Sequence, residues 1–170
     1  EEMLEMAGAS DAKAIQVGGP SGRLIGSNEF HRTICYEDLP TGGAMIVIGN
    51  HRNILDVVKN FTEFFIEESC GSCAPCRYLT VILRNKLQKI IDGKGVMKDL
   101  DELVQWGEQM KKANRCGLGQ TAANPILTSI ENFRSDYEAR IEKGKDFDTK
   151  FDLNKAIMES SRAVGRFPQA

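Results

Sequence analysis

No apolar stretch of this 170-residue sequence approaches the ~18 residues that a membrane-spanning helix requires. Neither sign of charge dominates, because 22 basic residues balance 24 acidic ones and the formal net charge is -2. Nucleic acid and anionic membranes are therefore not expected as partners. The first two residues, Glu1 and Glu2, differ from the basic start of a secretory signal peptide. These absences predict a cytoplasmic protein that does not insert into a membrane.

The residue groupings that carry acid–base or nucleophilic catalysis are also missing. The two histidines, His31 and His51, stand apart from any acidic or cysteine cluster, which favours packing or surface roles. The glycine-rich residues 18–22 have neither the spacing of a dinucleotide fingerprint nor the Lys-Ser/Thr ending of a P-loop. We interpret them as a tight turn. The patterns predict no catalytic residue and no residue that binds an organic cofactor.

The composition, 41% hydrophobic and 27% charged, is that of a soluble globular protein with one domain or two small ones. Five cysteines are an odd number, and four of them have metal-ligand spacing. This favours a reducing compartment over a secreted disulfide scaffold. The remaining one, Cys35, is predicted to be a buried free thiol. Since the sequence lacks an initiator methionine and begins in a helix-like segment, we expect it to be a fragment of a longer chain.

The cysteine spacing is the most informative pattern. Cys70, Cys73 and Cys76 repeat every three residues, and Cys116 follows much later. Three thiols on one loop can point at a single inorganic object, and a C-x-x-C-x-x-C run is typical of iron–sulfur ligation. A structural zinc site more often uses two separate ligand pairs. The pattern favours a four-iron cluster with Cys116 as the fourth ligand, although spacing alone leaves zinc and unligated thiols open.

Residues beside these cysteines have chemistry that suits a cluster. Backbone amides of Gly71, Ser72 and Gly117 could donate hydrogen bonds to cluster sulfurs and raise the reduction potential. Arg77 and Arg115 could offset the negative charge of thiolate ligands, or could form ordinary surface ion pairs. A cluster whose irons all have protein ligands has no open coordination site, so it would transfer electrons and bind no substrate.

Periodicity predicts an α+β fold. Residues 14–17 and 44–48 are predicted strands, which together with the glycine turn indicate a small α+β unit over residues 1–49. From residue 53 onward, apolar residues recur at three and four. Helices are predicted at 53–68, from the cysteine loop to 91, at 99–112, at 124–141 and at 152–164. Their short links make an antiparallel four-helix bundle over residues 50–143 the natural packing, followed by a helical tail at 144–170.

Cap signals set the expected helix ends. Asn53 and Asn124 are predicted N-caps. Asp99 is predicted to open a helix with capping-box spacing. Gly93 is predicted to end a helix in the left-handed conformation.

These motifs resemble a known family. The run from Glu68 to Arg77, followed by residues 116–119 and Pro125, resembles the flavoprotein (51-kDa-type) subunit of NADH dehydrogenases, a subunit of respiratory complex I that also occurs as the diaphorase α subunit of NAD-reducing hydrogenases. Residues 17–22 and 41–44 resemble its ubiquitin-like β-grasp (SLBB) domain. The implied fold is an α+β chain: a β-grasp unit at 1–49 without its first strand, then a four-helix bundle iron–sulfur domain at 50–143.

The resemblance implies a 4Fe-4S cluster held by four cysteines: Cys70, Cys73, Cys76 and Cys116. In the family, the cluster receives single electrons from FMN, which NADH reduces, and relays them to clusters of partner iron–sulfur subunits. The FMN and NAD(H) sites lie upstream of the part that this chain resembles, so this C-terminal portion would not bind nicotinamide by itself.

Two features bear on the choice within the family. Respiratory subunits usually carry small residues where this chain has Tyr78 and Leu79, and the chain has a tail over residues 152–166. Both favour the α subunit of a bacterial NAD-reducing hydrogenase. A respiratory complex I subunit and a zinc-stapled, non-redox interaction module are the alternatives.

Overall fold

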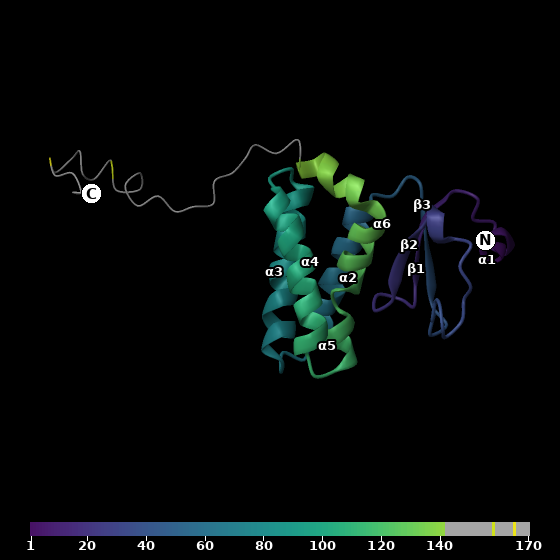
Figure 1. Cartoon of the computed structure of the whole chain (residues 1–170), viewed down its shortest axis with the longest axis horizontal. Helices are drawn as coiled ribbons and strands as arrows, with labels where there is room; N and C mark the ends of the chain where they lie inside the picture. Colours follow the sequence, from purple (N-terminus) through teal and green to yellow (C-terminus); the bar gives the residue numbers. More distant parts are fainter. Residues whose placement is uncertain (142–157, 159–164, 166–170) are drawn as a thin grey trace.

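Figure 1 shows the computed structural model of the chain, which describes residues 1–141 together with Met158 and Gly165. The described residues form an α+β fold in which a three-stranded sheet lies beside a group of long helices. Apart from Met158, the predicted helix at 152–164 lies outside the described residues. Among the described helices, none is both long enough and apolar enough to cross a membrane.

The sheet contains strands β1 (Ala12–Val17), β2 (Arg23–Gly26) and β3 (Met45–Gly49) in the order β2-β1-β3, with both pairs antiparallel. The two predicted strands are confirmed as β1 and β3. β2 was not predicted, because four residues are too few to show a clear alternation.

The predicted glycine turn is confirmed as the connection between β1 and β2. Gly18 has φ +90°, a conformation that residues with a Cβ rarely adopt. A Cβ on Gly22 would lie 1.7 Å from the Val17 carbonyl oxygen. The glycines therefore allow a tight hairpin, in which the backbone passes too close to itself for side chains.

Alternation along the strands gives the sheet two apolar faces. On one face, Ala14, Leu24 and Ile48 join the core of the helices. On the other face, Ile15 and Val17 belong to a second, smaller cluster. A short helix, α1 (Glu2–Met6), contributes Leu4 to that cluster, and a 3-10 turn, η1 (Ser27–Glu29), follows β2.

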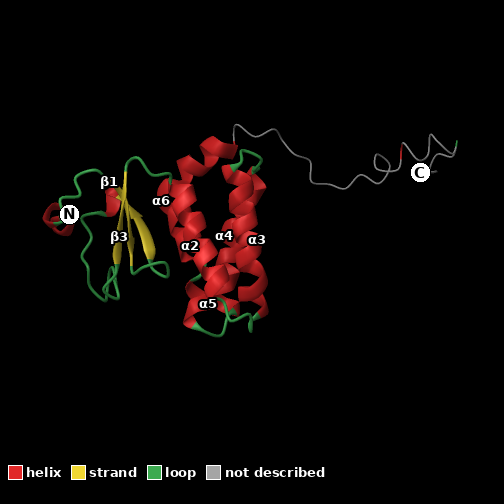
Figure 2. Cartoon of the chain, turned by 180° about the vertical axis from the view of Figure 1, so that it is seen from behind, coloured by secondary structure: helices red, strands yellow, loops and turns green. Residues whose placement is uncertain are grey.

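The long helices are α2 (Ile54–Glu68), α3 (Ala74–Ile91), α4 (Met97–Ala113) and α6 (Asn124–Ile141). Helices α2 and α4 each pack against both α3 and α6, so the four elements enclose one core. Figures 1 and 2 show the sheet beside α6 and α2, with α3 and α4 farther away. The largest core side chains include Phe65, Leu83, Leu87, Leu103, Met110 and Tyr137.

Helix α6 also covers the edge of the sheet. The Thr128 hydroxyl accepts a hydrogen bond from the Leu24 amide at 3.0 Å. The Asn132 amide donates to the Leu24 carbonyl at 3.1 Å. Since an unpaired strand edge exposes backbone donors and acceptors, these side chains give β2 partners and fix the sheet against the helices.

Two predicted helix ends are confirmed. Asn53 caps α2, because its Oδ1 accepts a hydrogen bond from the Leu55 amide at 3.0 Å. Gly93 follows the end of α3 with φ +69°, as a left-handed glycine does.

One predicted helix start and one predicted cap are wrong. Helix α4 begins before Asp99, whose carboxylate reaches back to accept the Val96 amide at 3.0 Å. The predicted start of α6 at residue 124 is confirmed, but Asn124 is the first helical residue and not the N-cap, and its side chain donates to the Ser21 carbonyl at 2.8 Å. In both cases the side chain that was predicted to cap a helix makes a different contact. Asp99 accepts the amide of the earlier residue Val96, and Asn124 donates to the distant Ser21 carbonyl.

The segment after Cys116, where no helix was predicted, forms a short helix, α5 (Gly117–Thr121). This helix was not predicted because two glycines within its five residues lower the helix propensity. His31 and His51 are exposed, which agrees with the surface alternative among their predicted roles. Cys35 is a free thiol, but it is half-buried, so the prediction of a buried position is wrong.

Candidate metal centre

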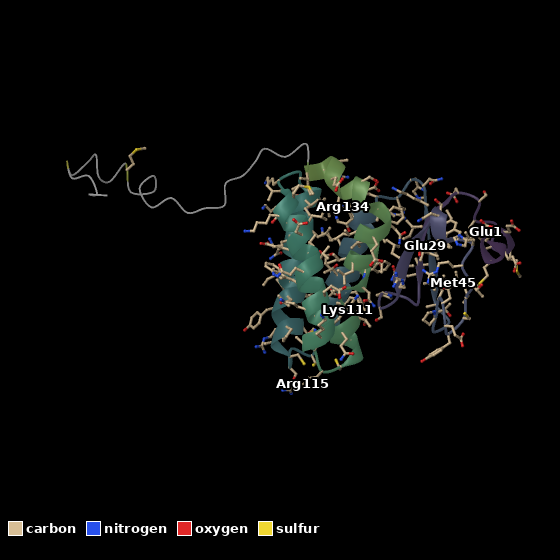
Figure 3. The ribbon with its side chains drawn as sticks, in the orientation of Figure 1. Glu1, Glu29, Met45, Lys111, Arg115 and Arg134 are labelled. Carbon is tan, nitrogen blue, oxygen red and sulfur yellow. The ribbon has the colours of Figure 1, made fainter. Side chains whose placement is uncertain are left out.

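The four cysteines of the motif lie at one end of the helices. Helices α3 and α4 pack together and are joined by residues 92–96, so they run antiparallel. The start of α3 and the end of α4 therefore lie at the same end. Figure 3 shows Arg115, next to Cys116, at that lower end, below Lys111 of α4 and opposite Arg134 of α6.

All four side chains are free thiols. Cys70 and Cys116 are exposed, Cys73 is half-buried and Cys76 is buried. Among the described residues, no three His, Cys, Asp or Glu side chains are placed to hold one metal ion. A single zinc ion needs its sulfurs at ~2.3 Å, whereas a four-iron cluster takes one thiolate per iron and its ligands surround a larger object.

Two of the cysteines stand directly before helices. Cys73 precedes α3 and Cys116 precedes α5, both with extended backbone conformations. Neither side chain caps its helix. Pro75, in the first turn of α3, has no amide hydrogen to satisfy. Both sulfurs therefore remain available as ligands.

The loop between α2 and α3 is braced by its own polar groups. Gly71 turns the chain with φ +72°. Its amide donates to the Ser69 hydroxyl at 3.2 Å, and its carbonyl accepts from Nη1 of Arg77 at 2.7 Å. The guanidinium carbon lies 4.7 Å from the ring centroid of Tyr78. These contacts hold a positive charge next to the cysteine loop.

This geometry bears on two expectations. The Gly71 amide donates to the Ser69 hydroxyl, which does not support the prediction that it donates to a cluster sulfur. Among the described residues, neither Arg77 nor Arg115 forms an ion pair. The surface ion-pair interpretation of these two arginines is therefore not supported. Donation by the amides of Ser72 and Gly117 stays a prediction.

Asn114 positions the Cys116 segment and was not predicted. Its buried side-chain amide donates to the carbonyls of Met110 and Gly119, both at 2.9 Å. A Cβ on Gly119 would lie 2.8 Å from the Asn114 Cγ. The end of α4 is thus tied to α5, with Cys116 between them. An amide residue just after the last helical turn, followed by two glycines, was the available signal.

Ser69 is the second residue that the sequence analysis missed. It ends α2, and its Oγ lies 3.2 Å from the sulfur of Cys76. A hydroxyl directly before the first cysteine of a ligand loop was the signal.

The donor set fits an iron–sulfur cluster. It consists of thiols alone, none of which is consumed by a disulfide, and thiolates are the usual ligands of such clusters. Cys70 and Cys73 come from the loop with a left-handed glycine, Cys76 comes from the first turn of α3, and Cys116 comes from a segment that Asn114 ties to α4. The arrangement can hold a cluster that gains and loses electrons.

Comparison with known proteins bears on this site. Residues 56–140 match the family described as the NADH-ubiquinone oxidoreductase-F iron-sulfur binding region. That range includes all four cysteines of the motif.

Individual relatives are similar over most of this chain. The NAD-reducing hydrogenase HoxS subunit alpha of Cupriavidus necator is 40% identical over 165 residues, which are 96% of this chain and 27% of that protein. The F subunit of the NADH-quinone oxidoreductase of Mycobacterium bovis is 31% identical over 153 residues, which are 84% of this chain and 34% of that protein. The chain thus spans about a quarter to a third of the length of these curated relatives.

A solved structure has a similar fold. The crystal structure of an NAD+-reducing NiFe hydrogenase in the H2-reduced state matches with a TM-score of 0.74 and 34% sequence identity. The match covers 92% of this chain and 28% of the hydrogenase chain.

Proposed function

We infer that this chain, which belongs to the NADH-ubiquinone oxidoreductase-F iron-sulfur binding family, is an electron-transfer module that carries a 4Fe-4S cluster. When bound, such a cluster accepts and returns one electron at a time. The observation that carries the inference is the set of four free thiols at one end of the helices, inside the segment that matches the family.

The proposed ligands are the four cysteines of the motif: Cys70, Cys73, Cys76 and Cys116. The first three come from the end of α2 and the start of α3, and the last comes from the link between α4 and α5. A cluster held in this way would join two segments that the chain otherwise connects only through the helices. Arg77 would keep a positive charge near the thiolates, and Asn114 would keep Cys116 in reach.

The proposed electron route needs more than this chain. FMN and NAD(H) would bind to a preceding part of the full-length protein, and the electrons would pass singly to iron–sulfur clusters of partner subunits. The chain would thus be part of an NAD(H)-dependent oxidoreductase without holding its nicotinamide site.

We propose the diaphorase of an NAD-reducing hydrogenase as the assembly. The higher identity to the hydrogenase relative, 40% against 31% for the quinone oxidoreductase relative, favours it over respiratory complex I. The fold likeness to an NAD+-reducing hydrogenase supports the same choice.

We propose a domain division as well. Residues 1–49 would form an SLBB-type β-grasp unit and residues 50–143 a four-helix bundle that binds the cluster. The helical tail predicted at 144–170 lies outside the described residues, apart from Met158 and Gly165. The three-stranded sheet and the four mutually packed helices support the first two units.

Metal analysis of anaerobically purified protein tests the proposed function. We expect a brown protein with about four irons and four sulfides per chain, which bleaches and becomes EPR-active when reduced. A colourless protein that holds one zinc ion per chain would instead indicate a zinc-stapled interaction module and would contradict the proposal.

A further inference from the structure

The contact between Ser69 and Cys76 has a defined direction once Cys76 ligates iron. The Ser69 Oγ lies 3.2 Å from the Cys76 sulfur, and the same oxygen accepts the Gly71 amide hydrogen at 3.2 Å. A hydroxyl has one hydrogen to donate. Because its oxygen already accepts from an amide, that hydrogen is free to point at the sulfur. A sulfur that ligates iron is a thiolate and has no hydrogen, so Ser69 must be the donor in the iron-bound protein.

The surroundings make this hydrogen bond effective. Cys76 is the buried member of the motif, with 6% of its surface exposed, whereas Cys70 and Cys116 are exposed. A hydrogen bond away from water is electrostatically stronger than one in water. Within residues 1–141, Cys76 is also the one motif cysteine whose sulfur has a side-chain hydrogen-bond partner. The ligand set is therefore asymmetric, with one sulfur in a dry, hydrogen-bonded position.

We propose that Ser69 sets the reduction potential of the centre through its hydrogen bond to Cys76. Hydrogen bonds to ligand sulfurs are one of the means by which a protein tunes such potentials. Donation by Ser69 draws electron density from the sulfur and stabilises the state that carries one more electron. The potential is therefore higher than it would be without the hydroxyl. This inference rests on the proposed function, because it requires Cys76 to ligate a redox-active cluster.

A purely structural role makes a different prediction. Ser69 ends α2 and also supports Gly71, so its loss could loosen the loop and release iron. Such loosening would lower the iron content without moving the potential of the clusters that remain. If Ser69 acts on the cluster through the Cys76 sulfur, its loss changes the reduction potential of protein that retains its full iron content.

The test compares Ser69→Ala with the wild type by EPR-monitored redox titration of the iron-loaded protein, with dithionite as reductant. We expect the reduced-to-oxidised ratio at a fixed solution potential to fall threefold to tenfold, where tenfold corresponds to about 59 mV for a one-electron couple. Ser69→Thr keeps the hydroxyl and should restore the wild-type potential. Ser72→Ala is the matched control, because Ser72 is an exposed hydroxyl in the same loop without a side-chain hydrogen bond among the described residues.

The outcomes separate the two proposals. A wild-type protein without iron contradicts the proposed function itself. Iron-loaded Ser69→Ala with an unchanged potential overturns the role of Ser69 and leaves the proposed function intact. If Ser69→Ala loses iron, the isosteric pair Ser69→Thr and Ser69→Val repeats the comparison, and the Val variant should have the lower potential. If every variant without the hydroxyl loses its iron, Ser69 is structural and this inference fails.

Discussion

The two ends of the α3–α4 pair differ in how many of their polar side chains have hydrogen-bond partners. Where α3 ends and α4 begins, the carboxylate of Asp99 is buried and accepts hydrogen bonds from Lys86 at 2.8 Å and Lys89 at 2.6 Å. It also accepts the Val96 amide. At the other end, four free thiols have one side-chain hydrogen bond between them, the contact of Ser69 with Cys76. At the Asp99 end the buried carboxylate has partners within the chain, whereas at the cysteine end most of the thiols have no side-chain partner among the described residues.

The end that contains Asp99, Lys86, Lys89 and Glu102, here called the charged end, has hydrogen-bond partners for its charged groups. Burial by itself raises the pKa of Asp99, but the hydrogen bonds from Lys86 and Lys89 outweigh it and hold the pKa below its ordinary value of 3.8. Burial likewise lowers the pKa of Lys86, and its hydrogen bonds to Asp99 and Glu102 reverse that effect. Because each buried charge has partners, this end needs no ligand. The comparison supports the proposal that the thiols at the cysteine end bind a cluster.

The largest expected effect comes from removing a ligand at the cysteine end. Cys116→Ser should lose most of the iron, because Cys116 would be the one ligand that ties the α4–α5 segment to the cysteine loop. The measurement is iron and sulfide content with the visible spectrum after anaerobic purification. Cys35→Ser is the control, since Cys35 lies outside the motif. Full iron content and an unchanged spectrum in Cys116→Ser would refute the ligand assignment.

The next effect lies at the charged end. Asp99→Ala leaves Lys89 and the Val96 amide without their acceptor and leaves Lys86 with Glu102 alone, which should lower the free energy of unfolding by about 3 kcal/mol. Denaturant unfolding of the metal-free protein measures it. Asp101→Ala is the matched control, because Asp101 is exposed on the same helix and has no partner among the described residues. Equal losses in the two variants would show that the network does not stabilise this end.

A smaller effect tests the tether of Cys116. A Cβ on Gly119 would press on the buried side chain of Asn114 at 2.8 Å, and overpacking of this kind costs about 1–3 kcal/mol. Gly119→Ala should therefore lower the free energy of unfolding and the iron retention together. Gly117→Ala is the control, since its Cβ would meet nothing within 4 Å. If Gly117→Ala is the more damaging change, Asn114 does not position this segment.

The smallest effect is a pH dependence of the charged end. The pKa of Asp99 is lower in the folded than in the unfolded protein, so its contribution to stability is present above the ordinary pKa and is lost as the pH falls through the folded value. Above about pH 5 the stability gap between wild type and Asp99→Ala should be constant, and below about pH 4 it should narrow. If the difference in free energy of unfolding between wild type and Asp99→Ala widens on acidification, folding raises the pKa of Asp99 and does not lower it.

Prediction from sequence succeeded where a local pattern decides the structure. The period of apolar residues predicted the long helices. The glycine turn and the cap at Asn53 are equally local. The predicted capping roles of Asp99 and Asn124 were wrong, because capping rules do not consider distant partners. Asp99 accepts hydrogen bonds from two lysines of α3, and Asn124 donates to the Ser21 carbonyl.

The sequence alone determined the chemistry of the donor set, because residue type decides that four thiols are present and spacing decides that three of them lie close together along the chain. Only the tertiary structure decided which of them is buried, which hydroxyl reaches a sulfur and how Asn114 ties Cys116 to the end of α4. Exposure and hydrogen bonding depend on how α2, α3 and α4 pack, and that packing is the sum of many contacts between residues far apart in the chain. The electronic surroundings of the sulfurs are therefore a property of the fold.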